Sequence, residues 1–291
     1  MALLPINAAD TYDPDALSAG LTGLKKDAPV VVMIHGYKFC PHAAPHNPHT
    51  HILSLSPANP SRKAVPWPAM LCVEKAGGLA IGFGWSARGS IWQAHKSAQR
   101  AGDQLRRLLT QIEQLSPGRQ VHIIAHSLGA RVAIEALHDL APGIVRRMIL
   151  ISAALFQREA NAALASAAGQ EVEVFNVTGR ENMAFDVLLR AAFPVHGATT
   201  GRGLSHQNWL DLPLDQPDRL RGLAQLGFNI DRPDRNICHW SGYARRSVWP
   251  LYRAILLAAD ETPFALLSAA IRTNTATNPR SCASDLLPLG I

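Results

Sequence analysis

The chain has 291 residues, of which 47% are hydrophobic and 17% are charged, a composition typical of a globular protein and not of a disordered one. The formal net charge is +6, but the basic residues are scattered with no run longer than a pair, so no nucleic-acid-binding stripe is expected. No apolar stretch approaches the roughly 20 residues that span a bilayer, so no integral membrane segment is expected either.

The cysteines and the N-terminal segment bear on the compartment. Cys40, Cys72, Cys238 and Cys282 are far apart and fit no CxxC pattern, which favours reduced thiols. The first residues, MALLPINAADTYDPDAL, lack the basic start and the apolar core of a signal peptide. The sequence therefore predicts a cytoplasmic protein.

Short β-branched runs alternate with helical patterns along the chain. Ser90 is the expected N-cap of a helix that begins at Ile91 and ends at Pro117–Gly118. Because repeated β–α units favour parallel strands, the sequence predicts an α/β fold with a mostly parallel, doubly wound sheet and helices on both faces. Strands are expected at 30–34, 79–83, 121–125, 148–152 and 172–177, and helices at 91–115, 128–140, 156–168, 183–192 and from about 248.

Residues 1–272 are expected to form a single domain with two interruptions. Residues 40–69 are rich in proline and histidine, and residues 196–236 contain clusters of glycine, proline and aspartate. Both are predicted to be loop insertions, which are often functional when they are this long. Residues 273–291 are polar with little periodicity and predict a flexible C-terminal tail.

Residues 121–131, VHIIAHSLGAR, place a serine between a buried run and a helical pattern. A strand that turns sharply into a helix needs small residues near the bend, and Ala125 and Gly129 flank Ser127 in those positions. This arrangement is a nucleophile elbow, usually written GxSxG, with alanine in place of the first glycine. The turn exposes the serine hydroxyl, and the Leu128 N–H at the helix start is expected to bind a developing oxyanion.

His35–Gly36 directly follows the strand expected at 30–34. A fold with such an elbow places its second oxyanion-hole amide after an HG of this kind, and the Tyr37 N–H is the expected donor. Gly36 allows the backbone to approach the substrate closely. His35 itself is expected to pack and to hydrogen-bond the loop.

Three motifs together resemble the α/β-hydrolase superfamily. They are IHGY at 34–37, GFGW at 82–85 and AHSLG at 125–129. The sequence is more closely similar to a group of bacterial α/β-hydrolase-fold proteins of poorly defined function, over about residues 29–260. The resemblance implies a serine hydrolase and leaves the substrate unspecified.

In this superfamily the chain order of the catalytic residues is serine, then acid, then histidine. The resemblance therefore implies that His239, which precedes the helix expected from about 248, is the general base. His126, beside the serine, is expected to pack under the loops. His196 and His206 lie in the predicted insertion and are expected to be loop residues.

The acid should follow the strand at 172–177, commonly as G-x-x-D, but Asn182 stands where the aspartate would fall. An asparagine orients the histidine without stabilising the imidazolium by a full charge. Glu181 is one residue early with a longer side chain, and Asp186 lies one helical turn beyond Asn182 on the same face. We rank Glu181 first, Asp186 second and Asn182 third.

The histidine-rich loop contains side chains of types that bind metals. Cys40, His42, His46, His49 and His51 are of ligand types that zinc prefers. They are spread along an irregular, proline-rich segment without a second ligand pair at finger spacing, so no metal site is assigned and the loop is expected to shape the substrate entrance.

These observations predict a serine hydrolase, esterase-like or lipase-like, that cleaves a carboxylic ester or a related small acyl compound through an acyl-enzyme. Ser127 is the nucleophile, His239 the base, and Glu181 or Asp186 the acid, and no cofactor is needed. The alternative is a catalytically impaired hydrolase-fold binding protein, which the irregular acid position favours. A metal-dependent hydrolase that uses the histidine-rich loop is a third hypothesis, and the acyl length and oligomeric state stay open.

Overall fold

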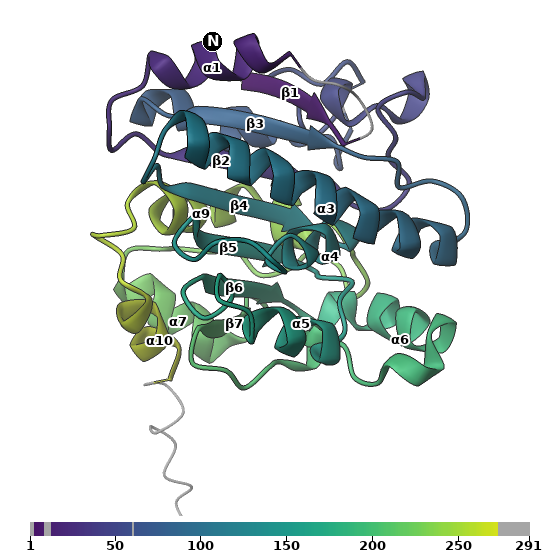
Figure 1. The fold of residues 1–291 in the computed structure, drawn as a ribbon. Helices are drawn as coiled ribbons and strands as arrows, with labels where there is room; N and C mark the ends of the chain where they lie inside the picture. Colours follow the sequence, from purple (N-terminus) through teal and green to yellow (C-terminus); the bar gives the residue numbers. More distant parts are fainter. Residues whose placement is uncertain (1–2, 9–12, 60, 273–291) are drawn as a thin grey trace, which may run out of the picture.

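The computed structural model describes residues 3–8, 13–59 and 61–272. Within these residues seven strands form one sheet in the order β1-β3-β2-β4-β5-β6-β7, and every neighbouring pair is parallel (Figure 1). The strands are β1 (Leu3–Asn7), β2 (Val30–Ile34), β3 (Leu79–Gly84), β4 (Val121–His126), β5 (Val145–Ile151), β6 (Glu173–Thr178) and β7 (Trp209–Pro213). The expected fold class is confirmed, since the sheet is parallel and helices cover both of its faces.

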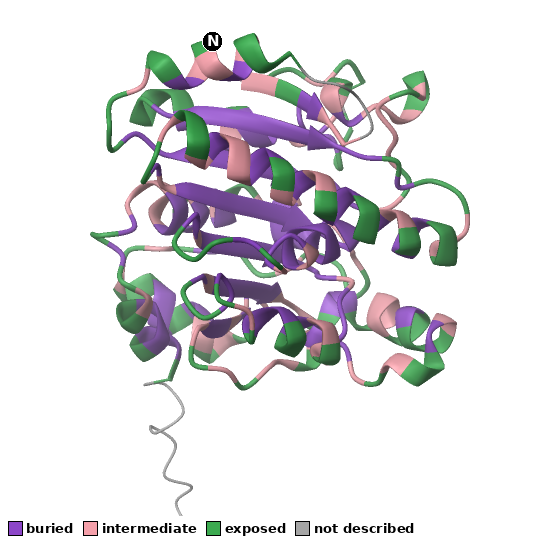
Figure 2. Ribbon diagram, in the orientation of Figure 1, coloured by how far each residue is buried: buried purple, intermediate pink, exposed green. Residues whose placement is uncertain are grey.

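The central strands are continuous apolar runs because both faces of the sheet are covered (Figure 2). In β2 all five residues are buried, and successive side chains point to opposite faces. Val30, Val32 and Ile34 join one hydrophobic cluster, whereas Val31 and Met33 join the other.

Helices cover the two faces in separate groups. Helices α1, α3, α4 and α5 pack on one face, and α2, α7, α8, α9 and α10 pack on the other, whereas α6 lies beyond the carboxyl ends of the strands (Figure 1). The helices are α1 (Pro14–Thr22), α2 (Trp67–Leu71), α3 (Ile91–Leu115), α4 (Leu128–Glu135), α5 (Gln157–Leu164), α6 (Met183–Ala192), α7 (Pro217–Gln225), α8 (Ser241–Ala244), α9 (Trp249–Leu257) and α10 (Phe264–Arg272). Short 3-10 turns are η1 (Ala44–His46), η2 (Pro48–Thr50), η3 (Val73–Ala76), η4 (Arg180–Asn182), η5 (Pro194–His196), η6 (Thr200–Arg202) and η7 (Arg246–Val248).

Helix α3 begins with the expected cap. The Ser90 hydroxyl accepts a hydrogen bond from the Gln93 N–H at 3.2 Å, and the Gln93 side chain accepts one from the Ser90 N–H at 2.8 Å. This capping box satisfies two amides that the first turn of a helix leaves without partners. The predicted start of the helix at Ile91 is confirmed.

Three parts of the sheet differ from the sequence prediction. Strand β1 is short and contains Pro5, and it lies at an edge where proline is tolerated. Strand β5 begins at Val145 and not at Met148, because the buried Arg147 continues the strand and its Nε donates to a Glu173 carboxylate oxygen at 2.6 Å. Residues 196–236 are not only a loop insertion, since they contain β7 and α7.

The proline- and histidine-rich loop is anchored in the core. Ile52, Leu53 and Trp67 are fully or almost fully buried and join the hydrophobic cluster on the face covered by α9. The predicted flexible tail, residues 273–291, lies outside the described residues. Among the described residues, no helix has the length and apolar character required to cross a bilayer.

Candidate active site

Ser127 lies on a strained turn between β4 and α4. Its backbone has φ 55° and ψ −124°, a left-handed value that non-glycine residues rarely adopt. The Ser127 N–H donates to the Ile151 carbonyl at 3.0 Å, which ties the turn to the end of β5. A Cβ on Gly129 would lie 2.5 Å from the His35 carbonyl oxygen, so this position requires a glycine and the elbow packs directly on the HG loop.

Gly36 is equally constrained. A Cβ there would lie 2.8 Å from the Ser127 Cβ and 2.9 Å from the His126 carbonyl oxygen. His35 holds this loop: its Nδ1 donates to the Gly36 carbonyl, and its Nε2 accepts from the Trp85 N–H, both at 3.0 Å. Burial lowers the pKa of His35 to about 3, so the ring is neutral and its role is structural.

His239 connects the serine to a third residue. Its Nε2 lies 2.8 Å from the Ser127 Oγ, and its Nδ1 lies 2.6 Å from the Asn182 Oδ1. An amide oxygen only accepts, so the Nδ1 carries the proton and the Nε2 presents a lone pair to the serine hydroxyl. This is the tautomer that a general base requires.

Aromatic rings fix the position of His239. Phe185 of α6 stacks on it with a centroid distance of 4.5 Å, and the His126 ring lies 4.6 Å away. The His126 Nε2 also donates to the His239 carbonyl at 3.0 Å, which is the packing role expected for it. Burial, with a further contribution from His126, lowers the pKa of His239 well below its ordinary value.

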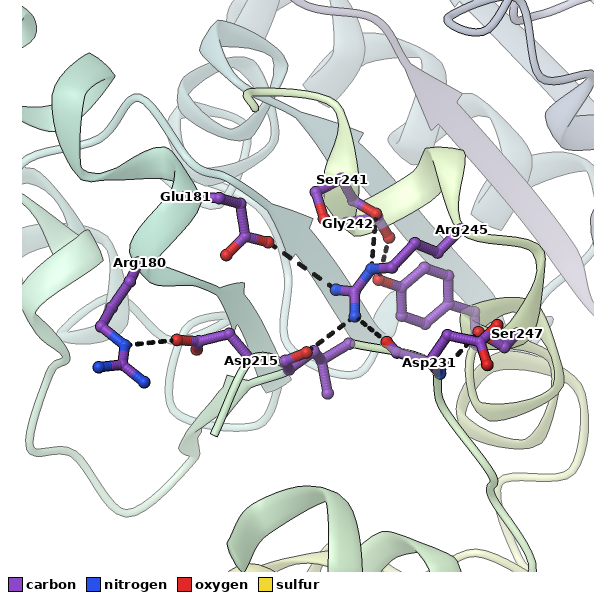
Figure 3. A network of polar contacts seen from close by, with 10 residues as sticks. Arg180, Glu181, Asp215, Asp231, Ser241, Gly242, Arg245 and Ser247 are labelled. Carbon is purple, nitrogen blue, oxygen red and sulfur yellow. Dashed lines mark hydrogen bonds and ion pairs between the residues drawn. The ribbon is translucent and has the colours of Figure 1, made fainter. Parts of the chain in front are cut away.

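Glu181, ranked first as the acid, does not contact His239. Its carboxylate is directed toward Arg245, with 3.9 Å between the Arg245 Nη2 and the Glu181 Oε1 (Figure 3). Adjacent residues of the tight turn η4 point in different directions, so Asn182 reaches the imidazole and Glu181 pairs with a buried guanidinium. The Glu181 carbonyl still supports the site by accepting from the Cys238 N–H at 2.8 Å, next to His239.

Asp186, ranked second, stands behind Asn182. The Asn182 Nδ2 lies 3.5 Å from the Asp186 Oδ2, so the carboxylate contacts the asparagine and not the histidine. Burial raises the pKa of Asp186 to about 6, against weaker lowering by hydrogen bonds. The polar chain therefore runs from Ser127 through His239 and Asn182 to Asp186, with the third-ranked candidate in contact with the histidine.

The backbone amides of Tyr37 and Leu128 belong to residues of the serine cavity. Neither the Tyr37 N–H nor the Leu128 N–H donates a hydrogen bond to another group in the part of the chain that the structure describes. Both residues line the same cavity as Ser127, and the Lys38 N–H is used by the Ala87 carbonyl at 2.8 Å. Free amides beside a nucleophile suit an oxyanion hole.

The serine opens into a cavity of about 400 Å³. The sequence did not predict the walls of this cavity, which include the 65% exposed Leu188 of α6. The lining is largely apolar, with Lys38 as its charged residue among Tyr37, Phe39, Ile91, His126, Ser127, Leu128, Ala154, Phe185, Leu188, Leu189, Ala192, His239 and Trp240.

The histidine-rich loop lies beside the site, where His51 packs on the cavity residue Phe39. Within residues 3–8, 13–59 and 61–272, three side chains of metal-ligand types lie close together in another part of the molecule, and no histidine of the loop is among them. The His49 Nε2 contacts the Asn7 Oδ1 at 2.8 Å, and His51 packs on Phe39 with a centroid distance of 5.0 Å.

The fold and the elbow define an α/β-hydrolase-fold protein. Residues 16–158 match the model of a family described as "Alpha/beta hydrolase of unknown function (DUF900)", which confirms the resemblance expected from the sequence. The matched part contains the HG loop and the elbow, whereas Asn182 and His239 lie beyond it. A search of curated proteins returned no match.

Solved structures also resemble this chain. One is the crystal structure of a lipase-esterase related protein from Clostridium acetobutylicum ATCC 824. It is 8% identical in sequence, with coverage of 82% of this chain and 96% of that chain and a TM-score of 0.35. The likeness is too distant for any residue to be carried over.

Proposed function

We propose that the protein is a serine hydrolase that cleaves a carboxylic ester or a related acyl compound. The observation that carries the proposal is the 2.8 Å contact between the His239 Nε2 and the hydroxyl of a serine on a strained elbow. A hydroxyl becomes a competent nucleophile when an adjacent base takes its proton.

In the proposed reaction the Ser127 Oγ attacks the acyl carbonyl while the His239 Nε2 takes its proton. The oxyanion of the tetrahedral intermediate accepts hydrogen bonds from the Tyr37 and Leu128 amides. The intermediate collapses as His239 protonates the leaving alcohol, which leaves an acyl group on the serine. Water, deprotonated by the same imidazole, then releases the acid and restores the enzyme.

The cavity supports an apolar acyl group as the substrate moiety. Its walls include Phe39, Phe185 and Leu189, and its volume of about 400 Å³ is in the range of small-molecule sites. Burial of each methylene of an acyl chain contributes about 0.8 kcal/mol, so apolar chains gain more from this cavity than polar ones. We therefore infer a small acyl compound and not a polymer as the substrate.

The alternative function is a hydrolase-fold binding protein with impaired chemistry. It is favoured by one observation: the side chain in contact with the His239 Nδ1 is the neutral Asn182, and the Asp186 carboxylate contacts that asparagine, at 3.5 Å, and not the histidine. An amide oxygen fixes the tautomer but stabilises the imidazolium less than a carboxylate does. We favour the enzyme because the His239 Nε2 lies within hydrogen-bond distance of the hydroxyl on the elbow.

Hydrolysis of p-nitrophenyl esters by Ser127→Ala tests the proposal. The wild type should turn over acetate and longer esters, and the variant should lose turnover while it keeps its circular dichroism spectrum. Ser205→Ala, at an exposed serine, is the matched control and should retain the wild-type rate. An equal rate in Ser127→Ala would refute the assignment.

The cysteines support a reducing compartment for this chemistry. Cys40, Cys72 and Cys238 are free thiols, and secreted enzymes tend to pair their cysteines. We therefore propose the cytoplasm as the site of the reaction.

A further inference from the structure

A second cluster of chemistry-bearing side chains lies outside the proposed active site. His95 of α3, Glu159 of α5 and His196 of η5 each offer one ligand atom, and these atoms all lie within 4.8 Å of one another. The three residues come from segments far apart in the sequence. Two imidazoles and a carboxylate are a ligand set that divalent transition metals take in proteins.

The two imidazoles have nitrogens without partners. The His95 Nε2 and the His196 Nδ1 are buried atoms with no hydrogen-bond partner in the described structure. His95 as a whole is only 7% exposed, and its Nε2 lies 3.5 Å from the Glu159 Oε1. Because buried polar atoms without partners cost free energy, one such nitrogen on each of two neighbouring imidazoles points to a ligand at this cluster.

The carboxylate has capacity for a cation. The Glu159 Oε1 is hydrogen-bonded to Arg131, and the Oε2 accepts from the Phe156 N–H at 3.3 Å. Arg131 also lies 3.9 Å from Glu135, so one guanidinium is shared by two carboxylates. Each carboxylate oxygen has two lone pairs, and hydrogen bonds to a ligating side chain orient it toward the metal.

We propose that His95, Glu159 and His196 bind a divalent transition metal ion, with Zn²⁺ as the best match, and that a water molecule completes a tetrahedral site. Zinc–nitrogen and zinc–oxygen distances of about 2.0–2.2 Å require the side chains to close in slightly from their present separation. Metals of the calcium and magnesium class prefer all-oxygen sites and are excluded by the two imidazoles.

A metal ion at this site would stabilise the α6 wall of the cavity beside Ser127. His196 follows α6 directly, and Phe193 at the end of α6 packs on His95 with a centroid distance of 4.4 Å. Leu189, which lines the cavity, packs with Phe193 and Phe156. A bound ion would therefore link α3, α5 and the end of α6. The metal site itself does not depend on the proposed hydrolase activity.

Titration of the metal-free protein with Co²⁺ tests the proposal, because tetrahedral cobalt with nitrogen ligands absorbs visible light. We expect one Co²⁺ per chain, displacement by Zn²⁺, and a melting temperature that rises by a few degrees with Zn²⁺. His196→Ala should lose the absorption band and at least tenfold in affinity. This residue lies in a partly exposed turn, so the variant should keep its circular dichroism spectrum.

Two further variants make the result decisive. Glu159→Gln should weaken Co²⁺ binding, whereas His138→Ala, at a partly exposed histidine outside the cluster, should bind like the wild type. The absence of stoichiometric binding to the wild type would overturn the proposal. Binding that is unchanged in His196→Ala, or that is lost in His42→Ala instead, would also overturn it.

Discussion

A charge-conserving swap behind the histidine tests how the proposed base works. In the combined variant Asn182→Asp/Asp186→Asn, a carboxylate takes the place of the amide that contacts the His239 Nδ1 at 2.6 Å, and an amide takes the place of the carboxylate behind it. The side chains keep their shapes and the net charge of the site is unchanged. The swap therefore isolates the effect of a direct charge on the imidazolium.

The expected rise in the pKa of His239 can be worked out from the distance between the two charges. Two opposite charges about 4 Å apart interact by about 4 kcal/mol at an effective dielectric constant of about 20. At about 1.4 kcal/mol per pH unit this sets an upper limit of about 3 units on the rise in the pKa of His239. Solvent at the cavity mouth reduces the effect, so a rise of about 1–3 units is expected.

The assay is the pH profile of kcat/KM for a p-nitrophenyl ester. The swap should move the acidic limb to higher pH and increase the rate at pH 8 at least tenfold, since the imidazolium in the transition state is better stabilised. Asn182→Asp alone should gain less, because two carboxylates about 3.5 Å apart share a proton. A swap that leaves both the limb and the rate unchanged would refute the role given to Asn182.

Three other outcomes are expected. The lowered pKa of His239 should place the acidic limb of the wild-type profile below pH 6.5, since the base loses its lone pair only when the pH falls through its pKa; a limb at or above pH 7 would contradict this. Gly36→Ala puts a Cβ 2.8 Å from the Ser127 Cβ and should lower both turnover and melting temperature, whereas Gly23→Ala, with open space around it, should change neither. Leu188→Ser should reduce kcat/KM for octanoate esters several-fold and leave acetate esters nearly unaffected, because only the longer chain reaches that wall; equal losses on both esters would argue against an acyl cavity there.

Part of the candidate site could be predicted because the residues that form the elbow are adjacent in the sequence. The elbow needs small residues around Ser127, and the sequence displays them within five positions. Gly36 and Gly129 fit because each approaches a backbone carbonyl or the serine too closely for a side chain. The β–α rhythm likewise predicted the parallel sheet, since buried strands are read as apolar runs.

The partner of the histidine was not predictable in the same way. Glu181 has the right chemistry and nearly the right position, but its direction depends on Arg245, a buried cation more than sixty residues away. The proposed metal site was not predicted for a related reason. His95 and His196 are brought together only by tertiary packing, whereas the histidines that are close in sequence form no such group among the described residues. Strand β1 was missed because a short segment with Pro5 carries little strand signal.

The most direct test of the account is covalent labelling with a fluorophosphonate probe, read by intact mass and peptide mapping. An activated serine reacts with such a probe and an idle hydroxyl does not. We predict one probe per chain, attached to Ser127, and no labelling of His239→Ala. A wild-type protein that stays unlabelled, or that is labelled at a different residue, would contradict the claim that His239 activates Ser127.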